Sequence, residues 1–130
     1  MKNLIDSSAW IEYFRGNKRY QSIIDDLIDK NAICTNDIIL AELLPSILHR
    51  NEHNLVELLD GVKKCPLTIN WQEICEMQLL NFEHGNYRIG ILDIIIAQNC
   101  IQNELKLVEC DKHFEVMAGY MPLKLFLSER

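Results

Sequence analysis

The chain has 130 residues, of which 48% are hydrophobic and 25% are charged. This is the usual length of one domain, and it carries enough apolar side chains for a core without disulfides or a structural metal. The formal net charge of −6 at pH 7 argues against a non-specific nucleic-acid coat, which is usually basic. We therefore expect a single domain over residues 1–130.

A membrane span and a signal peptide are not expected. The sequence has no run of about 18 apolar residues, and Asp6 interrupts the first short apolar stretch. The five cysteines are odd in number, form no CxxC pair and lie in apolar segments. They are Cys34, Cys65, Cys75, Cys100 and Cys110. We expect buried free thiols and a cytoplasmic protein.

The first half of the chain alternates short apolar runs with longer helical ones, beginning with a strand at residues 2–6. A short helix capped by Ser7 or Ser8 follows and stops near Gly16. A second helix covers about 19–30, and a short strand covers 32–34. The cap residues at 35–37 begin a helix through about residue 50, in which Pro45 predicts a kink or an early break. Another helix covers about 52–62.

The second half continues the alternation with a strand at 64–67. Asn70 caps a helix that runs to His84 and ends at Gly85. A buried helix covers 91–103, a strand covers 106–110, a short helix or turn covers 112–118, and 122–125 forms a last edge strand. Strands alternating with helices predict an α/β protein with a mainly parallel sheet of about four to five strands.

Four acids occupy positions where a carboxylate is unexpected. Asp6 and Asp111 follow two of the predicted strands, and the carboxyl ends of parallel strands are where open α/β sheets place their sites. Glu42 is the only polar residue in the segment 38–44 (IILAELL). Asp93 is likewise the only polar residue in the segment 89–97 (IGILDIIIA). Buried carboxylates must be paired or bound to metal. If the four converge, a cation is needed between them, and hard oxygen ligands select Mg²⁺ or Mn²⁺ rather than Zn²⁺.

Each acid also has a structural explanation. Asp6 would cap the first helix, and Asp111 would cap the turn at 112–114. Glu42 would pair with a buried Arg or Lys side chain, and Asp93 would be the N-cap of a helix that begins at Ile94. Taken together, the four are explained better by a metal site than by four separate caps.

Several other polar residues are candidates to hold substrate. These are Ser7, Arg15, Lys18, Arg19, Asn36, Arg88 and Lys112. Capping is the alternative for Ser7 and Asn36, and a solvated surface charge is the alternative for the cations. The four histidines lack zinc-ligand spacing, and we assign none of them a role. Trp10, Trp71 and Phe82 are interpreted as core residues.

Four short segments resemble a known family. Residues 4–16 (LIDSSAWIEYFRG) resemble the opening of a PIN domain, particularly that of the VapC toxins of type II toxin–antitoxin systems. Segments 39–44 (ILAELL), 90–97 (GILDIIIA) and 107–114 (LVECDKHF) are similar to the second, third and fourth acidic motifs of that family. They occur in the family's order and spacing, and the resemblance covers essentially the whole chain. In one departure, Glu109 stands where the family commonly has Thr or Ser.

The resemblance implies a three-layer α/β/α PIN-like fold and a Mg²⁺- or Mn²⁺-dependent endoribonuclease that hydrolyses RNA, often tRNA or ribosomal RNA. It implies catalytic and metal-binding roles for Asp6, Glu42, Asp93 and Asp111. It also implies a homodimer and a VapB-like antitoxin as partner, and, as the lack of a long apolar run predicts, no membrane is expected among the partners. Two alternatives stay open: a PIN-domain nuclease with a housekeeping role in RNA processing, and a non-catalytic PIN-like binding module. A haloacid-dehalogenase-like phosphatase would need a second Asp where Ser8 stands.

Overall fold

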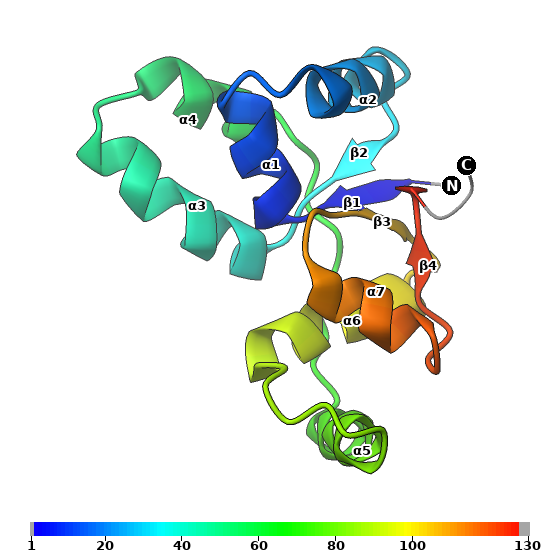
Figure 1. Ribbon diagram of the computed structural model, residues 1–130. Coiled ribbons are helices and arrows are strands. Elements are labelled where there is room, and N and C mark those ends of the chain that lie inside the picture. Colours follow the sequence, from blue (N-terminus) through cyan, green and yellow to red (C-terminus); the bar gives the residue numbers. More distant parts are fainter. Residues whose placement is uncertain (1, 128–130) are drawn as a thin grey trace.

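The computed structural model describes residues 2–127 and contains a parallel sheet surrounded by helices (Figure 1). The strands are β1 (Asn3–Ile5), β2 (Ile33–Cys34), β3 (Lys106–Val108) and β4 (Lys124–Leu125). The helices are α1 (Ser7–Phe14), α2 (Lys18–Asp29), α3 (Asp37–His49), α4 (His53–Asp60), α5 (Trp71–Glu83), α6 (Ile91–Gln102) and α7 (Lys112–Ala118). The strand order is β2-β1-β3-β4, and all three pairings are parallel.

This topology confirms the predicted three-layer α/β/α class. The crossover from β1 to β2 runs in one direction across the sheet, and those from β2 to β3 and from β3 to β4 run in the other. Because such crossovers are right-handed, α1 and α2 cover one face while α6 and α7 cover the other (Figure 1). The α3–α4 pair packs beside α1, and α5 packs on α6.

The central strands are buried on both faces, as expected when helices cover both sides of a sheet. Leu4 and Ile5 of β1 and Leu107 of β3 are fully buried. Trp10 of α1 and Phe114 of α7 are also fully buried. A core of this kind holds the two central strands rigidly, which fixes the residues that follow them.

Polar side chains begin several of the helices. Asp6, Asn36, Asn70 and Asp111 are N-caps whose side chains accept a backbone amide hydrogen of the following turn. The Asn70 cap was predicted, and Asp6 and Asp111 occupy the capping positions that were given as alternatives to metal binding. The prediction that Ser7 or Ser8 caps α1 is wrong, because Asp6 holds that position and the serines lie inside the helix. Gly90, not Asp93, is the N-cap of α6.

Three expectations about local structure are corrected. The predicted strand at 64–67 is only an isolated bridge between Thr35 and Lys64, since Pro66 has no amide hydrogen with which to extend the pairing. Pro45 does not end α3, which continues to His49. Trp71 and Phe82 are 60% and 42% exposed, because α5 packs on α6 rather than on the sheet.

The expectation of five buried free thiols is also wrong. Cys34 and Cys65 form a disulfide, because the Cys65 amide donates to the Thr35 carbonyl at 2.7 Å and brings the two cysteines side by side. Cys75 and Cys110 are exposed, and Cys100 is a buried free thiol. Among the described helices, none has the length and apolarity needed to cross a membrane.

Candidate metal centre

The ends of β1 and β3 bring two of the predicted acids to one edge of the sheet. Because these strands are parallel neighbours, Asp6 follows β1 close to the point where Asp111 follows β3. The Asp6 amide donates to the Val108 carbonyl at 2.9 Å, which joins the two strand ends. The Asp6 side chain is only 3% exposed. Asp6 and Asp111 therefore lie at the carboxyl ends of two neighbouring parallel strands, as predicted.

Helices α3 and α6 bring the other two acids toward the same space. Ser7 at the start of α1 donates to a Glu42 carboxylate oxygen of α3 at 3.3 Å. Desolvation raises the pKa of Glu42 above its ordinary value, and repulsion from Asp6, Asp93 and Asp111 raises it further. Four acids that are distant in sequence thus act on one another electrostatically.

Asp6 is the most buried of the four acids. Burial raises the pKa of Asp6, hydrogen bonds from Ser8 lower it, and repulsion from Asp93 and Asp111 raises it again. Both Ser8 donors bind the same Asp6 oxygen, the amide at 3.1 Å and the hydroxyl at 2.5 Å. The net direction is upward, so the folded chain without a cation disfavours the charged form of Asp6.

His113, which was assigned no role from the sequence, lies next to Asp93 and Asp111. His113 Nδ1 lies 3.0 Å from an Asp93 carboxylate oxygen and 4.0 Å from an Asp111 oxygen. One donor atom from each of the three lies within 4.8 Å of the other two, a spacing that suits a shared metal ion. Asp6 and Glu42 do not belong to this set of three. They are linked to it because the charges of Asp93 and Asp111 raise the pKa values of Asp6 and Glu42.

Hydrogen bonds orient the loop that carries Asp111. The Glu109 carboxylate accepts from the Asp111 amide at 2.7 Å, and the Ser8 hydroxyl accepts from the Cys110 amide at 3.0 Å. Glu109 is 4% exposed, and burial raises the pKa of its carboxyl group. Glu109 therefore positions Asp111 through the backbone, at the place where the family commonly has a hydroxyl.

The predicted substrate-binding residues divide into two groups. Ser7 lies in the acidic cluster through its bond to Glu42, and the cations Arg15 and Lys112 are exposed. Asn36 is 1% exposed; its oxygen caps α3 by accepting from Ile39, and its amide nitrogen donates to Asn99 at 3.0 Å. Both polar atoms of Asn36 are engaged in these bonds, so the structure gives Asn36 the capping role that was its alternative, and its contact with substrate stays a prediction.

Asn36→Ala should lower the free energy of unfolding by about 2 kcal/mol, because it removes a cap and leaves the Asn99 oxygen without its donor. It should leave metal affinity unchanged. Chemical denaturation and Mn²⁺ titration by calorimetry measure the two effects. Asn70→Ala is the matched control and should cost about 1 kcal/mol, because it removes an exposed cap. A loss of Mn²⁺ binding in Asn36→Ala would assign Asn36 to the site instead.

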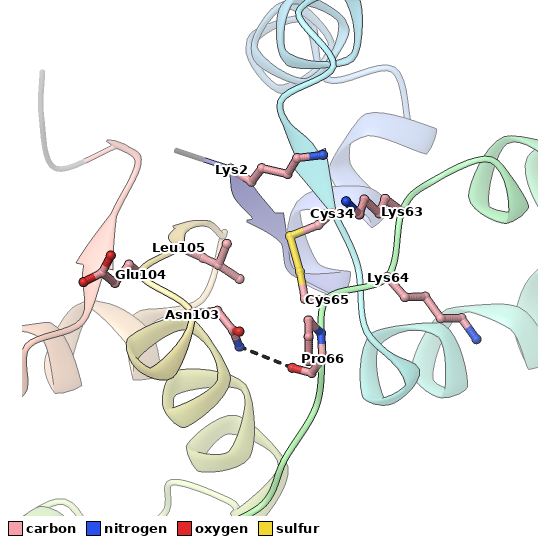
Figure 2. A pocket seen from close by; sticks show the side chains of 9 residues that line it. All are labelled: Lys2, Cys34, Lys63, Lys64, Cys65, Pro66, Asn103, Glu104 and Leu105. Carbon is pink, nitrogen blue, oxygen red and sulfur yellow. Dashed lines mark hydrogen bonds between the residues drawn. A yellow bond between two sulfur atoms is a disulfide. The ribbon is translucent and has the colours of Figure 1, made fainter.

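A cavity of about 510 Å³ lies away from the acids. Figure 2 shows Lys2, Lys63 and Lys64 around it, next to the Cys34–Cys65 disulfide. Lys2 precedes β1, and Leu105, another lining residue, precedes β3. The cavity therefore lies toward the amino ends of the strands, and none of the four acids lines it. Its size does not make it the catalytic site.

The fold is a parallel α/β domain with carboxylates at the carboxyl ends of its two central strands, an arrangement that suits a divalent cation. The PIN domain family model matches residues 4–120, and the chain belongs to this family. All four acids lie within the matched residues.

Individual relatives are similar over most of their length. The chain is 28% identical over 121 residues to VapC ribonuclease Mb1587 of Mycobacterium bovis and to Ribonuclease VapC11 of Mycobacterium tuberculosis. Each alignment covers 88% of this chain and 90% of the relative. The fold is similar to a chain in the crystal structure of VapBC2 from Rickettsia felis bound to a DNA fragment from their promoter. That match has a TM-score of 0.73 and 18% identity, and it covers 96% of this chain and 97% of that one.

Proposed function

We propose that this protein is a metal-dependent endoribonuclease, the toxin of a VapBC-type toxin–antitoxin pair, acting as a single domain in the cytoplasm. The observation that carries the proposal is the convergence of Asp6, Glu42, Asp93 and Asp111 at one edge of the sheet. Membership of the PIN family and the similarity to VapC ribonucleases support the same activity.

The residues of the cluster fit Mg²⁺ or Mn²⁺. Their donors are mainly carboxylate oxygens, which these hard cations prefer. Burial, and in smaller part repulsion from the other acids, raises the pKa values of Asp6 and Glu42, and a cation bound among these carboxylates would favour their charged forms. Asp6, Glu42 and Asp93 would hold the ion, directly or through water, and Asp111 would complete the pocket. When bound, a divalent ion would supply charge that polarises the scissile phosphate and lowers the pKa of a water molecule bound to it.

Other side chains of the cluster orient the acids through hydrogen bonds. Ser8 fixes the Asp6 carboxylate, Ser7 donates to Glu42, and Glu109 holds the amide of Asp111. Orientation of this kind keeps the acids in the geometry the reaction needs. Attack of water on phosphorus, with departure of the 3′-oxygen, leaves products with 5′-phosphate and 3′-hydroxyl ends.

Exposed cations near the acids are the proposed contacts to flanking phosphates. Lys112 begins α7 directly after Asp111. Arg15 lines a groove together with Glu42. Phosphate contacts supply much of the affinity for nucleic acid without reading its sequence. Lys18, Arg19 and Arg88 are further candidates of the same kind.

The groove that Arg15 and Glu42 line is also the proposed binding site of a VapB-like antitoxin. It has a volume of about 230 Å³ and lies between α1 and α3, with Ile11, Phe14 and Leu43 as apolar lining. Because Glu42 is one of the residues that line the groove, a partner bound there would cover this acid. The resemblance to VapC toxins implies a homodimer and an antitoxin partner, and we propose both for this chain.

The test is cleavage of RNA by purified protein. We expect cleavage with Mg²⁺ or Mn²⁺, none with EDTA, and 5′-phosphate on the products. Asp93→Asn should abolish cleavage, whereas Asp60→Asn, which changes an exposed acid at the end of α4, should not. Cleavage that continues in EDTA, or in Asp93→Asn, would contradict the proposal.

The toxin role has its own test. Expression of the active chain in bacteria should arrest growth, and expression of Asp93→Asn should not. Normal growth with a chain that cleaves RNA in vitro would favour the housekeeping alternative. Absence of both cleavage and metal binding would favour the non-catalytic binding module.

A further inference from the structure

The side chain of His113 occupies an unusual place for a histidine. It lies on the first turn of α7 with Nδ1 directed at two carboxylates, 3.0 Å from Asp93 and 4.0 Å from Asp111. The Asp111 side chain accepts from the His113 amide at 2.9 Å. This bond fixes the start of α7, and the hydrogen bond between Nδ1 and Asp93 orients the imidazole. The ring is therefore held in place rather than merely near the acids.

We propose that His113 is a nitrogen ligand of the divalent cation, together with Asp93 and Asp111, and that it makes the site prefer Mn²⁺ to Mg²⁺. The inference rests on the metal site of the proposed function and adds a ligand that the acidic motifs do not include.

The distances support coordination. In an octahedral shell of radius about 2.1 Å, adjacent ligand atoms lie about 3.0 Å apart and opposite ones about 4.2 Å apart. His113 Nδ1 and the Asp93 oxygen are joined by a hydrogen bond of 3.0 Å, which equals the first of these values, and the 4.0 Å separation from Asp111 is close to the second. A bound ion would take the place of the proton in that hydrogen bond.

The exposure of the three side chains also suits a cation. The side chains of His113, Asp93 and Asp111 are 40%, 22% and 36% exposed. A hydrated ion can therefore reach them from solvent and keep water on its open positions, which both substrate binding and hydrolysis require.

The chemistry of the ligand set predicts the metal preference. Mg²⁺ is a hard cation that takes oxygen ligands almost without exception, whereas imidazole suits transition metals. Replacing one oxygen by a nitrogen therefore costs Mg²⁺ more than Mn²⁺. A site made only of Asp6, Glu42, Asp93 and Asp111 would lack this bias.

The other histidines provide a contrast and a control. His84 stacks on Tyr120 and bonds the Leu80 carbonyl, and His53 is exposed at the start of α4. Neither belongs to the described set that could share a cation. His53→Gln therefore changes a histidine without touching the proposed ligands.

Electron spin-echo spectroscopy of Mn²⁺ bound to the purified protein tests the assignment directly. A nitrogen that coordinates Mn²⁺ produces a ¹⁴N modulation, which becomes a ¹⁵N modulation when histidine is labelled. We expect this modulation in the native protein and in His53→Gln, and its loss in His113→Gln. Calorimetry should show at least about a tenfold loss of Mn²⁺ affinity in His113→Gln, with a smaller change for Mg²⁺.

The outcomes separate this inference from the proposed function. If Mn²⁺ binds and Asp93→Asn removes it, but the native protein shows no nitrogen modulation, the His113 assignment is wrong and the metal site remains. Modulation that persists in His113→Gln also overturns the assignment. If no Mn²⁺ binds to the native protein, both the inference and the metal-dependent function fail. Because the decisive spectrum is that of the native protein, a misfolded variant would not leave the question undecided.

Discussion

Asp6→Asn should lower RNA cleavage by at least about 10³-fold. Charge stabilisation by a bound metal contributes several kcal/mol to catalysis, and each 1.36 kcal/mol corresponds to tenfold in rate. Asn has the shape of Asp but not its charge, so the variant weakens the hold on the cation. Its side-chain oxygen can still accept from the Ser8 amide and hydroxyl, as Asp6 does, so the start of α1 should be unchanged. Single-turnover cleavage of a labelled RNA measures the effect.

The same variant should be more stable than the native protein when metal is absent. Asp6 is 3% exposed, and both burial and its acidic neighbours oppose its charge. Removing the charge removes this penalty, so the melting temperature in EDTA should rise. Asp60→Asn is the control and should alter neither cleavage nor metal-free stability. Native cleavage by Asp6→Asn would show that Asp6 is only the cap of α1.

The second large effect is the dependence of stability on pH and metal. The folded chain raises the pKa of Asp6, Glu42 and Glu109 mainly by desolvation. In the unfolded chain these carboxyl groups titrate at about pH 4, and in the folded chain they titrate at higher pH. Between these two pH values the folded state therefore binds more protons than the unfolded state. Under this condition the free energy of unfolding falls as pH rises. Without metal, we expect the protein to lose stability from about pH 4 until the folded-state carboxyls have ionised.

A divalent cation should oppose this loss. At neutral pH, Mn²⁺ at a hundred times its dissociation constant should add about 2.7 kcal/mol to the free energy of unfolding. Near pH 4 the gain should be small, because protonated carboxyls are poor ligands. Urea denaturation over a grid of pH and Mn²⁺ concentration tests both slopes, and Asp93→Asn should lack most of the metal effect. Stability that rises with pH in EDTA, or that ignores Mn²⁺ at neutral pH, would contradict this account.

The sequence predicted the fold and the place of the acids because both depend on short-range patterns. Apolar runs separated by amphipathic segments indicate parallel strands with helical crossovers, and parallel neighbouring strands place Asp6 and Asp111 at one edge. Glu42 and Asp93 stood out because each interrupts an apolar run. The catalytic and metal-binding roles of these four residues remain proposals.

What could not be predicted depends on packing between distant segments. The direction of the His113 ring is set by how α7 meets the sheet, and two residues of separation from Asp111 do not reveal it. The exposure of Trp71 follows from α5 lying outside the sandwich of sheet and helices, which the hydrophobicity of Trp71 does not indicate. The Cys34–Cys65 pair is separated by 31 residues, and no local pattern joins them. Asn36 carried a clear cap signal, but its burial against Asn99 arises from the contact of two distant segments.

The central claim is that folding gathers Asp6, Glu42, Asp93 and Asp111 around one place for a divalent cation. Crystals grown with Mn²⁺, with diffraction recorded at the manganese absorption edge, test this claim most directly. We expect an anomalous peak among these carboxylates, with Asp93 and Asp111 within coordinating distance, and no such peak in crystals of Asp93→Asn. A fully ordered native structure in saturating Mn²⁺ with no peak there, or with manganese only at another surface, would contradict it.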